Sequence, residues 1–492
     1  MKTPLRSLVV LALWLAAAGG AGAQVVTASL AYTFTNPTPE SSMEWFGRRV
    51  AALGEDRVVI GCYGNRAGAI AAGAAYLFST TGTLITVITN PIPTDGESFA
   101  LSLAVVGTDK VLIGAPSNGT GAQKAGAAYL FSTNGTLLTT FTNPTPMIFE
   151  FFGYAVAALD ADNILIGAKY DGTIFNPDRG AVYLYSASGA LITTVTNPNP
   201  FASHEGFGGS VSGMGTDKLL IGAPDTSVGG NSSVGAAYLF TTNGTLISTF
   251  TNPNLGESDG FGLAVASVGT GRVIIGANVS AGTGAAYLFN TNGTLLVTFN
   301  NPDPANQEYF GSTLAALGTD LLLIGARQDT PSGTLGKDQA GTAYLFNTNG
   351  TLLLTIANPS PFPFFPSTAG EHFGSGVAVL GTNKLIIGAE SKNGGGFRPG
   401  AAHLFNVDFL PPPALRVEPL AGAGVRVAWP YPSTSFVLEQ CGDLNSSAAT
   451  NSWTLIPPPY TRGGASSNGI FYSFLSVTLS PTTNQFYRLR QP

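Results

Sequence analysis

The sequence predicts an all-β protein: a seven-bladed β-propeller closed by an N-terminal strand and followed by a small β-sandwich. Three observations carry this prediction: the composition, a unit that recurs seven times, and the complementary ends of the repeat array. The 492 residues are 44% hydrophobic and only 10% charged, and they include 63 glycines and 32 prolines. Such a composition, rich also in Asn and Thr, favours short strands joined by turns.

The charge balance argues against one class of partner. The formal net charge is -6, so the chain offers no basic surface for a phosphate backbone. We therefore expect no nucleic-acid partner. No apolar run beyond the N-terminal segment is long enough to span a bilayer, so we expect no membrane span.

The first 23 residues have the pattern of a secretory signal peptide. Lys2 and Arg6 precede an apolar run, which ends in the small residues Ala21-Gly22-Ala23. Cleavage is expected near Ala23, so residues 1–23 are left out of the fold. The prediction is an exported protein, extracellular or on the cell surface.

The rest of the chain up to residue 408 is built from one recurring unit. Each unit begins with Phe, then has a strand, a tight turn, a strand ending in Ile-Gly-Ala, a variable loop, a third strand such as `GAAYLF`, an Asn-Gly turn and a fourth strand ending in Asn-Pro. Four short strands with turns between them are typical of a propeller blade. The leading residues recur every 49 to 63 positions: Phe46, Phe99, Phe152, Phe207, Phe261, Phe310 and Phe373.

The two ends of the array complement each other. The seventh unit stops after Asn406 without its fourth strand, whereas residues 30–39 supply a fourth strand with no preceding three. Pairing them would close the ring and leave no open sheet edge. We therefore expect a propeller over residues 24–408.

The stretch `STNGTLLTTFTNPTP`, residues 132–146, allows two interpretations. Asn134-Gly135-Thr136 matches a glycan acceptor, and Asn-Gly between apolar runs also predicts a hairpin turn. In other copies Thr81 or Ser188 replaces the Asn, whereas the Gly persists. The recurrence is therefore explained by backbone geometry, and the turn is the favoured interpretation.

Two half-motifs recur in register, Phe-Gly at the start of the unit and Ile-Gly-Ala-Pro in its middle, as at residues 113–116 and 221–224. In this the chain resembles the FG-GAP repeats of integrin α-subunit propellers and related bacterial proteins, from about residue 45 to 408. The resemblance implies a seven-bladed propeller that serves adhesion or ligand binding.

Many blades of that family carry a calcium loop between their first two strands. Calcium needs six to eight oxygen ligands, hence several carboxylates in one loop. Here the position is a tight turn with one acid or none, such as `VGTDK`, and only Asp160 and Asp162 form a spaced pair. We therefore predict no metal site and no cofactor; calcium bound without this loop motif stays an open alternative.

A carboxylate stands two residues before every leading Phe. It could form an acidic ring that binds cations or a basic partner, or it could accept backbone hydrogen bonds in the connection between blades. We favour the structural role, because buried loop amides must find acceptors. The seven residues are Glu44, Glu97, Glu150, Glu205, Asp259, Glu308 and Glu371.

No catalytic constellation stands out. The histidines, His204, His372 and His403, show neither metal-ligand spacing nor a His-Glu motif. A pair of ring carboxylates brought together for glycoside hydrolysis remains an open alternative. We predict no catalytic residues.

The variable loops and the blade-to-blade connections share one face, which is the candidate binding face. The loops of the last two blades are rich in aromatic and basic residues, as interface hot spots are. The alternative is that these Phe side chains fasten the loops to the blade surface. The candidate ligand-binding residues are Phe362, Phe364, Phe365, Phe397, Arg398 and Arg327.

After the propeller, residues 409–414 form a Pro-rich linker and residues 415–492 a small β-sandwich. Trp429, Trp453 and the ending `FYRLR` give it a loose similarity to fibronectin-type-III modules. Cys62 and Cys441 fall in separate domains, so no disulfide is expected.

The functional prediction is an exported, monomeric, non-enzymatic binding or adhesion protein for a protein or carbohydrate ligand. Two alternatives stay open: a polysaccharide-active enzyme on the same scaffold, and a structural surface-layer component.

Overall fold

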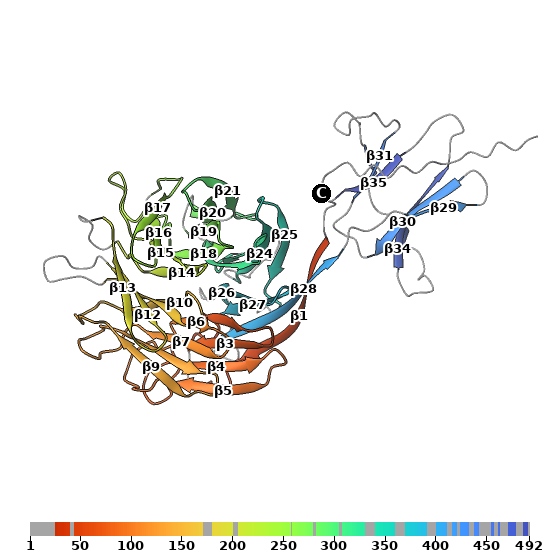
Figure 1. Ribbon diagram of the computed structural model, residues 1–492. Coiled ribbons are helices and arrows are strands. Elements are labelled where there is room, and N and C mark those ends of the chain that lie inside the picture. The colour runs from red at the N-terminus through yellow and green to blue at the C-terminus, as the bar shows by residue number, and fades with distance from the viewer. Residues whose placement is uncertain are drawn as a thin grey trace, which may run out of the picture. The chain divides into compact units, whose positions relative to one another are not determined.

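The protein folds into seven four-stranded antiparallel sheets arranged as a β-propeller (Figure 1). No helix occurs among the residues that the structure describes, which confirms the all-β prediction. The computed structural model describes residues 25–39, 44–170, 180–199, 205–256, 258–278, 282–304, 308–329, 340–359, 370–390 and 400–410, and after these only the backbone of short strands.

Each of the first six blades uses four consecutive strands. The bounds of the first three blades are β2 Val50–Leu53, β3 Arg57–Cys62, β4 Ala74–Ser79, β5 Leu84–Thr89; β6 Ser102–Val106, β7 Lys110–Ala115, β8 Ala127–Ser132, β9 Leu137–Thr142; β10 Phe152–Ala158, β11 Asn163–Ala168, β12 Ala181–Ser186 and β13 Leu191–Thr196. The next three are β14 Ser210–Met214, β15 Lys218–Ala223, β16 Ala236–Thr241, β17 Leu246–Thr251; β18 Ala264–Val268, β19 Arg272–Ala277, β20 Ala285–Asn290, β21 Leu295–Asn300; β22 Phe310–Leu317, β23 Leu321–Ala326, β24 Thr342–Asn347 and β25 Leu352–Ala357.

Burial changes across a blade as the residue types require. The second and third strands, such as β7 and β8, are buried over nearly their whole length and are correspondingly apolar. The fourth strand, such as β9, buries only one side chain fully, Phe141, and exposes Leu137 and Leu138. The fourth strands are therefore the outer strands, which face solvent on one side.

The Asn-Gly turn joins the third and fourth strands, as predicted. Gly135 has a φ of 84°, a conformation that glycine adopts without a steric cost. The Ser132 N–H donates to the Thr136 carbonyl at 2.9 Å, and the Asn134 side-chain oxygen accepts from the Thr136 N–H at 3.1 Å. The recurring motif is thus explained by a turn.

The two half-motifs meet where neighbouring blades pack. A Cβ on Gly114, in the Ile-Gly-Ala of the second blade, would lie 2.0 Å from the carbonyl oxygen of Gly153, in the Phe-Gly of the third. The same close approach recurs between Gly222 and Gly262, and across the seam between the last and first blades. Glycine at both positions lets the backbones of adjacent blades approach.

The seventh blade has the sheet order β1-β28-β27-β26. The N-terminal strand β1, Val25–Thr35, therefore lies beside β28, Ala401–Leu410, and the other two strands are β26 Phe373–Leu380 and β27 Lys384–Ala389. Phe34 of β1 is buried against Phe78 of the first blade, with ring centroids 5.2 Å apart. The first blade therefore packs against β1, which precedes it in sequence but belongs to the sheet of the seventh blade.

The chain divides into two compact units, of which Ala28–Asp408 holds the propeller. Strand β28 runs to Leu410, two residues into the segment predicted as a linker. The C-terminal segment has two sheets, and their arrangement as a fibronectin-type-III-like sandwich stays a prediction. One sheet has the order β29 Arg416–Leu420, β30 Gly424–Tyr431, β34 Phe471–Thr478, β33 Thr461–Arg462, and the other β32 Thr454–Ile456, β31 Val437–Cys441, β35 Phe486–Arg490.

Candidate functional site

The seven recurring carboxylates are buried, and each accepts a hydrogen bond from the Asn of the preceding Asn-Pro. Between Asn143 Nδ2 and Glu150 Oε2, for example, the distance is 2.7 Å. The other pairs are Asn36–Glu44, Asn90–Glu97, Asn197–Glu205, Asn252–Asp259, Asn301–Glu308 and Asn358–Glu371.

The same Asn side chains also organise the connection that follows. The Asn143 side-chain oxygen accepts from the Thr145 N–H at 3.0 Å, and the Glu150 carboxylate accepts from the Met147 N–H at 2.7 Å. A buried carboxylate so occupied is what the structural interpretation requires. The seven carboxylates therefore do not form an exposed acidic ring.

The residue before each leading Phe has a positive φ, which the sequence pattern did not reveal. Bulky residues pay a conformational cost in this region, and such strain often marks a functional site. Four of the seven carry a ring, so the strained backbone fixes aromatic groups at the same point of several blades. The residues are Trp45, Ser98, Phe151, Gly206, Gly260, Tyr309 and His372.

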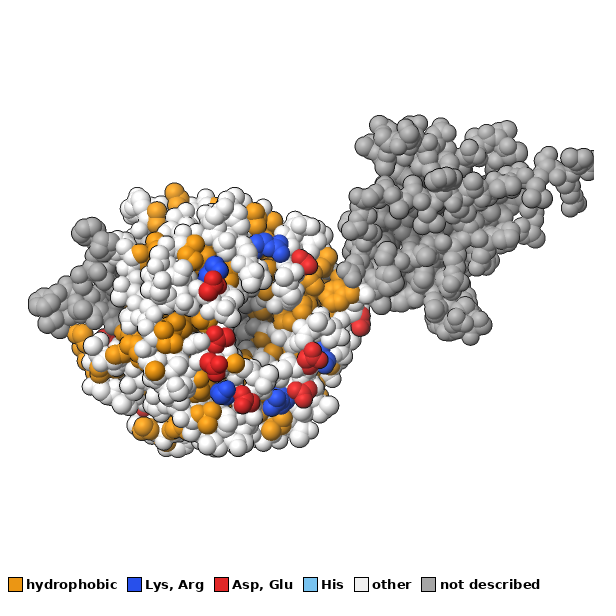
Figure 2. Space-filling model, viewed as in Figure 1, with side chains coloured by type: hydrophobic (Ala, Val, Ile, Leu, Met, Phe, Trp, Pro, Cys, Tyr) orange, Lys and Arg blue, Asp and Glu red, His pale blue; other side chains and the backbone are white. Residues whose placement is uncertain are grey.

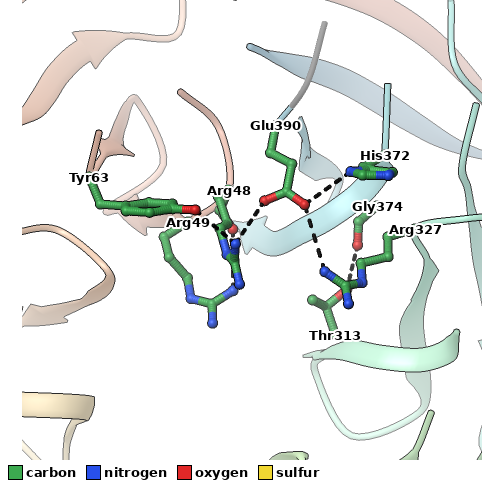
Figure 3. A network of polar contacts seen from close by, with 8 residues as sticks. All are labelled: Arg48, Arg49, Tyr63, Thr313, Arg327, His372, Gly374 and Glu390. Atoms are coloured by element: carbon green, nitrogen blue, oxygen red, sulfur yellow. Dashed lines mark hydrogen bonds and ion pairs between the residues drawn. The ribbon is translucent and has the colours of Figure 1, made fainter. Parts of the chain in front are cut away.

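A polar network joins the first, sixth and seventh blades at this level of the fold (Figure 3). At its centre is the buried carboxylate of Glu390, which follows β27. Its oxygens lie 3.4 Å from Arg48 Nη1, 3.7 Å from Arg327 Nη1 and 3.2 Å from His372 Nδ1. Burial alone would raise the pKa of Glu390, but the His372 hydrogen bond and the two guanidinium charges hold it below its ordinary value.

Two of the arginines in this region form cation–π contacts with tyrosine rings. Arg48 lies 5.3 Å from the centroid of Tyr63 and also donates to its hydroxyl at 2.9 Å. Arg327 lies 5.0 Å from the centroid of Tyr309. Such contacts are attractive and restrict where each guanidinium can point.

The third blade adds a further cation. Lys169 Nζ lies 5.3 Å from the ring centroid of Tyr154 and 5.0 Å from that of Tyr170. It also forms an ion pair with Asp225 at 3.1 Å. Burial would lower the pKa of Lys169, but Tyr154 and Asp225 raise it above the ordinary value.

Arg49 is the cation that forms no ion pair within the described residues, and Glu390 acts on it only at longer range. Its Nη1 donates to the Arg48 carbonyl at 3.4 Å. Burial, and next the neighbouring Arg48, lower the pKa of Arg49 to about 10. The guanidinium is still charged at neutral pH, so the network carries more positive than negative charge. We call Arg48, Arg49, Arg327 and Glu390 the arginine cluster.

Of the ligand-binding residues predicted from the sequence, Arg327 belongs to the arginine cluster. The other five, Phe362, Phe364, Phe365, Phe397 and Arg398, lie outside the described residues.

The sequence analysis missed Arg48, Arg49 and Glu390, although a signal was present. Arg48-Arg49 directly follow the first Phe-Gly, where the other units carry apolar or small residues. The position after Ile-Gly-Ala is charged in three units, at Lys169, Arg327 and Glu390, but Pro in two others. Departures from a repeat consensus at matching positions therefore pointed to the site.

The hairpin turns between the first and second strands carry ordinary surface ion pairs. Asp109 and Lys110 are 3.4 Å apart, and Asp217 and Lys218 2.8 Å. Arg57 donates to the Thr108 carbonyl of the next blade at 3.2 Å. Figure 2 shows acidic and basic side chains interspersed around the hollow at the centre of the face in view. Because opposite charges alternate, these turns offer no single-sign binding surface.

In the part of the chain that the structure describes, no cluster of His, Cys, Asp or Glu could hold a metal ion. Cys62 is a buried free thiol. Nor is any helix there long and apolar enough to cross a membrane.

No family model matches the chain, and no curated protein matches it. Solved structures with detectable similarity share little sequence with it. A protein of unknown function from Bacteroides caccae is 12% identical over 67% of this chain and 94% of that one, with a TM-score of 0.39. A GH74 xyloglucanase from Xanthomonas campestris is 13% identical over 82% of this chain and 59% of that one, with a TM-score of 0.46. A eukaryotic initiation factor is 10% identical over 76% and 87%, with a TM-score of 0.35. At these values none of the three carries an argument about function.

Proposed function

We propose that the protein is an exported, non-enzymatic FG-GAP-like propeller that binds a ligand on the face of the variable loops. The observation that carries the proposal is the arginine cluster. Its residues come from three blades, and it lies where the variable loops and the blade connections begin and end. Its three guanidinium groups face one carboxylate, and Arg49 forms no ion pair among the described residues. Charge left uncompensated on a rigid scaffold favours an external partner.

The protonation states favour binding over catalysis. The pKa of Glu390 is held low by His372 and two arginines, so this carboxyl stays ionised and is a poor proton donor. The recurring carboxylates are engaged by Asn side chains in the blade connections. A glycosidase would need one carboxyl with a raised pKa facing its substrate. Burial raises the pKa of Asp329, but this carboxyl is fully buried.

The proposal is tested by probing glycan and protein arrays with the purified chain and two matched variants. Arg49→Gln removes the uncompensated charge, whereas Lys110→Gln removes a charge from a hairpin turn at the opposite ends of the strands. We expect Arg49→Gln to weaken binding at least tenfold and Lys110→Gln to leave it unchanged. Equal binding by both variants, or turnover of a bound glycan, would contradict the proposal.

A further inference from the structure

The charge of the arginine cluster indicates what its ligand must carry. Arg48 and Arg327 share the single carboxylate of Glu390, and Arg49 adds a third guanidinium. Figure 3 shows the three guanidinium groups on the same side of Glu390. A group that completes this arrangement must be an anion, because a cation or a neutral group would leave the excess positive charge in place.

The shape of the donors favours a carboxylate. Guanidinium groups present planar forks that match a carboxylate in two parallel hydrogen bonds. Glu390 lies between Arg48 and Arg327 with one oxygen toward each, at ion-pair distances of 3.4 and 3.7 Å, and is not held by either fork. Arg327 Nε is buried and has no hydrogen-bond partner among the described residues. Glu390 Oε2 likewise accepts no hydrogen bond among the described residues, so Glu390 contacts Arg48 and Arg327 through ion pairs only. These ion pairs leave planar guanidinium donors available.

The cluster is also held ready before a ligand arrives. Tyr63 and Tyr309 fix the guanidinium groups of Arg48 and Arg327. Trp45 stacks on Tyr63 at 4.7 Å with the ring planes 3° apart. Donors fixed in advance lose less entropy on binding than mobile surface side chains.

Aromatic rings next to the cluster favour a sugar over a peptide. Trp45 and Tyr309 are partly exposed and are held by left-handed backbone, with φ values of 52° and 56°. Flat aromatic faces suit the apolar C–H face of a pyranose ring, and the adjacent arginines suit a carboxylate on that ring. An acidic peptide supplies the carboxylate but no flat apolar face.

We propose that the arginine cluster binds the carboxylate of a uronic acid unit, so that the ligand class is an acidic polysaccharide. This inference rests on the proposed binding function and names the ligand of that same site.

The test is calorimetric titration of the full chain with oligogalacturonate and with its methyl ester, in which the backbone is unchanged and the charge is masked. We expect the acid form to bind and the ester to bind at least tenfold more weakly. Arg49→Gln should lose at least tenfold in affinity for the acid form, and Arg49→Lys, which keeps the charge but not the fork, should lose part of it. Lys110→Gln is the matched control, and thermal unfolding verifies that each variant is folded.

Two further ligands distinguish the alternatives. Dextran sulfate that binds as tightly as the acid form would show that any polyanion suffices, and polyglutamate that does so would show that no sugar is needed. Either result overturns the inference. Arg49-dependent binding of a neutral glycan or a protein on the arrays, without oligogalacturonate binding, would overturn the inference but keep the proposed function. If neither the arrays nor the titrations detect binding, both fail.

Discussion

At the scale of single residues, the buried carboxylates show how one fold solves the same problem seven times. In the second blade Glu97 accepts hydrogen bonds from Asn118 at 2.9 Å and from Thr94 at 2.6 Å, besides the one from Asn90. In the sixth blade Asp329 takes the place of Asn118, and it interacts with Glu308. Two carboxyl groups can share a hydrogen bond only if one keeps a proton.

This difference gives a prediction for Asp329→Asn. Asp329 is fully buried, and burial raises its pKa above the ordinary value near 3.8, despite hydrogen bonds with Tyr344, Thr342 and Glu308 that lower it. An amide would donate to Glu308 without needing a proton, as Asn118 does to Glu97. We expect Asp329→Asn to increase the free energy of unfolding by about 1–2 kcal/mol at neutral pH.

The pH dependence provides the control. A carboxyl whose pKa is raised in the folded state contributes stability that is fully present below its unfolded pKa and is lost as pH rises through the folded value. The advantage of Asp329→Asn should therefore shrink as pH falls toward 4. Thermal unfolding of both proteins across this range would contradict the assignment if the difference were constant or grew in acid.

At the scale of strands and turns, most of the secondary structure could be predicted from local sequence. The Asn-Gly turn and the apolar second and third strands follow from short-range rules, because turn chemistry and strand burial depend on neighbouring residues. The recurrence of Phe-Gly together with Ile-Gly-Ala was visible, but its cause was not. The two motifs pair within a blade, where the Gly208 N–H donates to the Gly222 carbonyl at 3.0 Å. They also pack between neighbouring blades, as at Gly114 and Gly153, and that contact cannot be seen in the sequence.

That contact gives a prediction for Gly114→Ala. The new Cβ would lie 2.0 Å from the Gly153 carbonyl oxygen and 2.2 Å from Ser102 Oγ, so the two blades would have to separate. We expect a loss of about 3 kcal/mol or more in the free energy of unfolding, since overpacking against backbone is costly. Urea unfolding measures the change. Gly119→Ala in the same blade, where no atom lies within 4 Å of the added Cβ, should change stability little; equal losses would refute the packing argument.

At the scale of the whole molecule, the number of blades was predictable, whereas the departures from the repeat indicated a site without showing which residues meet in the arginine cluster. Counting the repeats gave the seven sheets, because each unit folds by its own pattern. The cluster joins Arg48 near one end of the propeller sequence to Arg327 and Glu390 near the other. They come together only because the blades close into a ring. A repeat consensus describes the residues that the blades share, whereas the site is formed by residues that differ from it.

The ring also depends on the two ends of the propeller sequence, which gives a prediction for Phe34→Ala. Phe34 of β1 occupies the position that Phe141 occupies in β9, and both are buried. If β1 pairs with β28 in solution, each truncation to Ala should cost about 3–5 kcal/mol of unfolding free energy. Urea unfolding of the two variants makes the comparison direct. A cost for Phe34→Ala near zero, with Phe141→Ala costly, would mean that the seventh blade does not depend on its N-terminal strand. Similar costs would mean that β1 stabilises the seventh blade as much as a fourth strand such as β9 stabilises its own blade. Burial of Phe34 against Phe78 would then help to hold the first and last blades together.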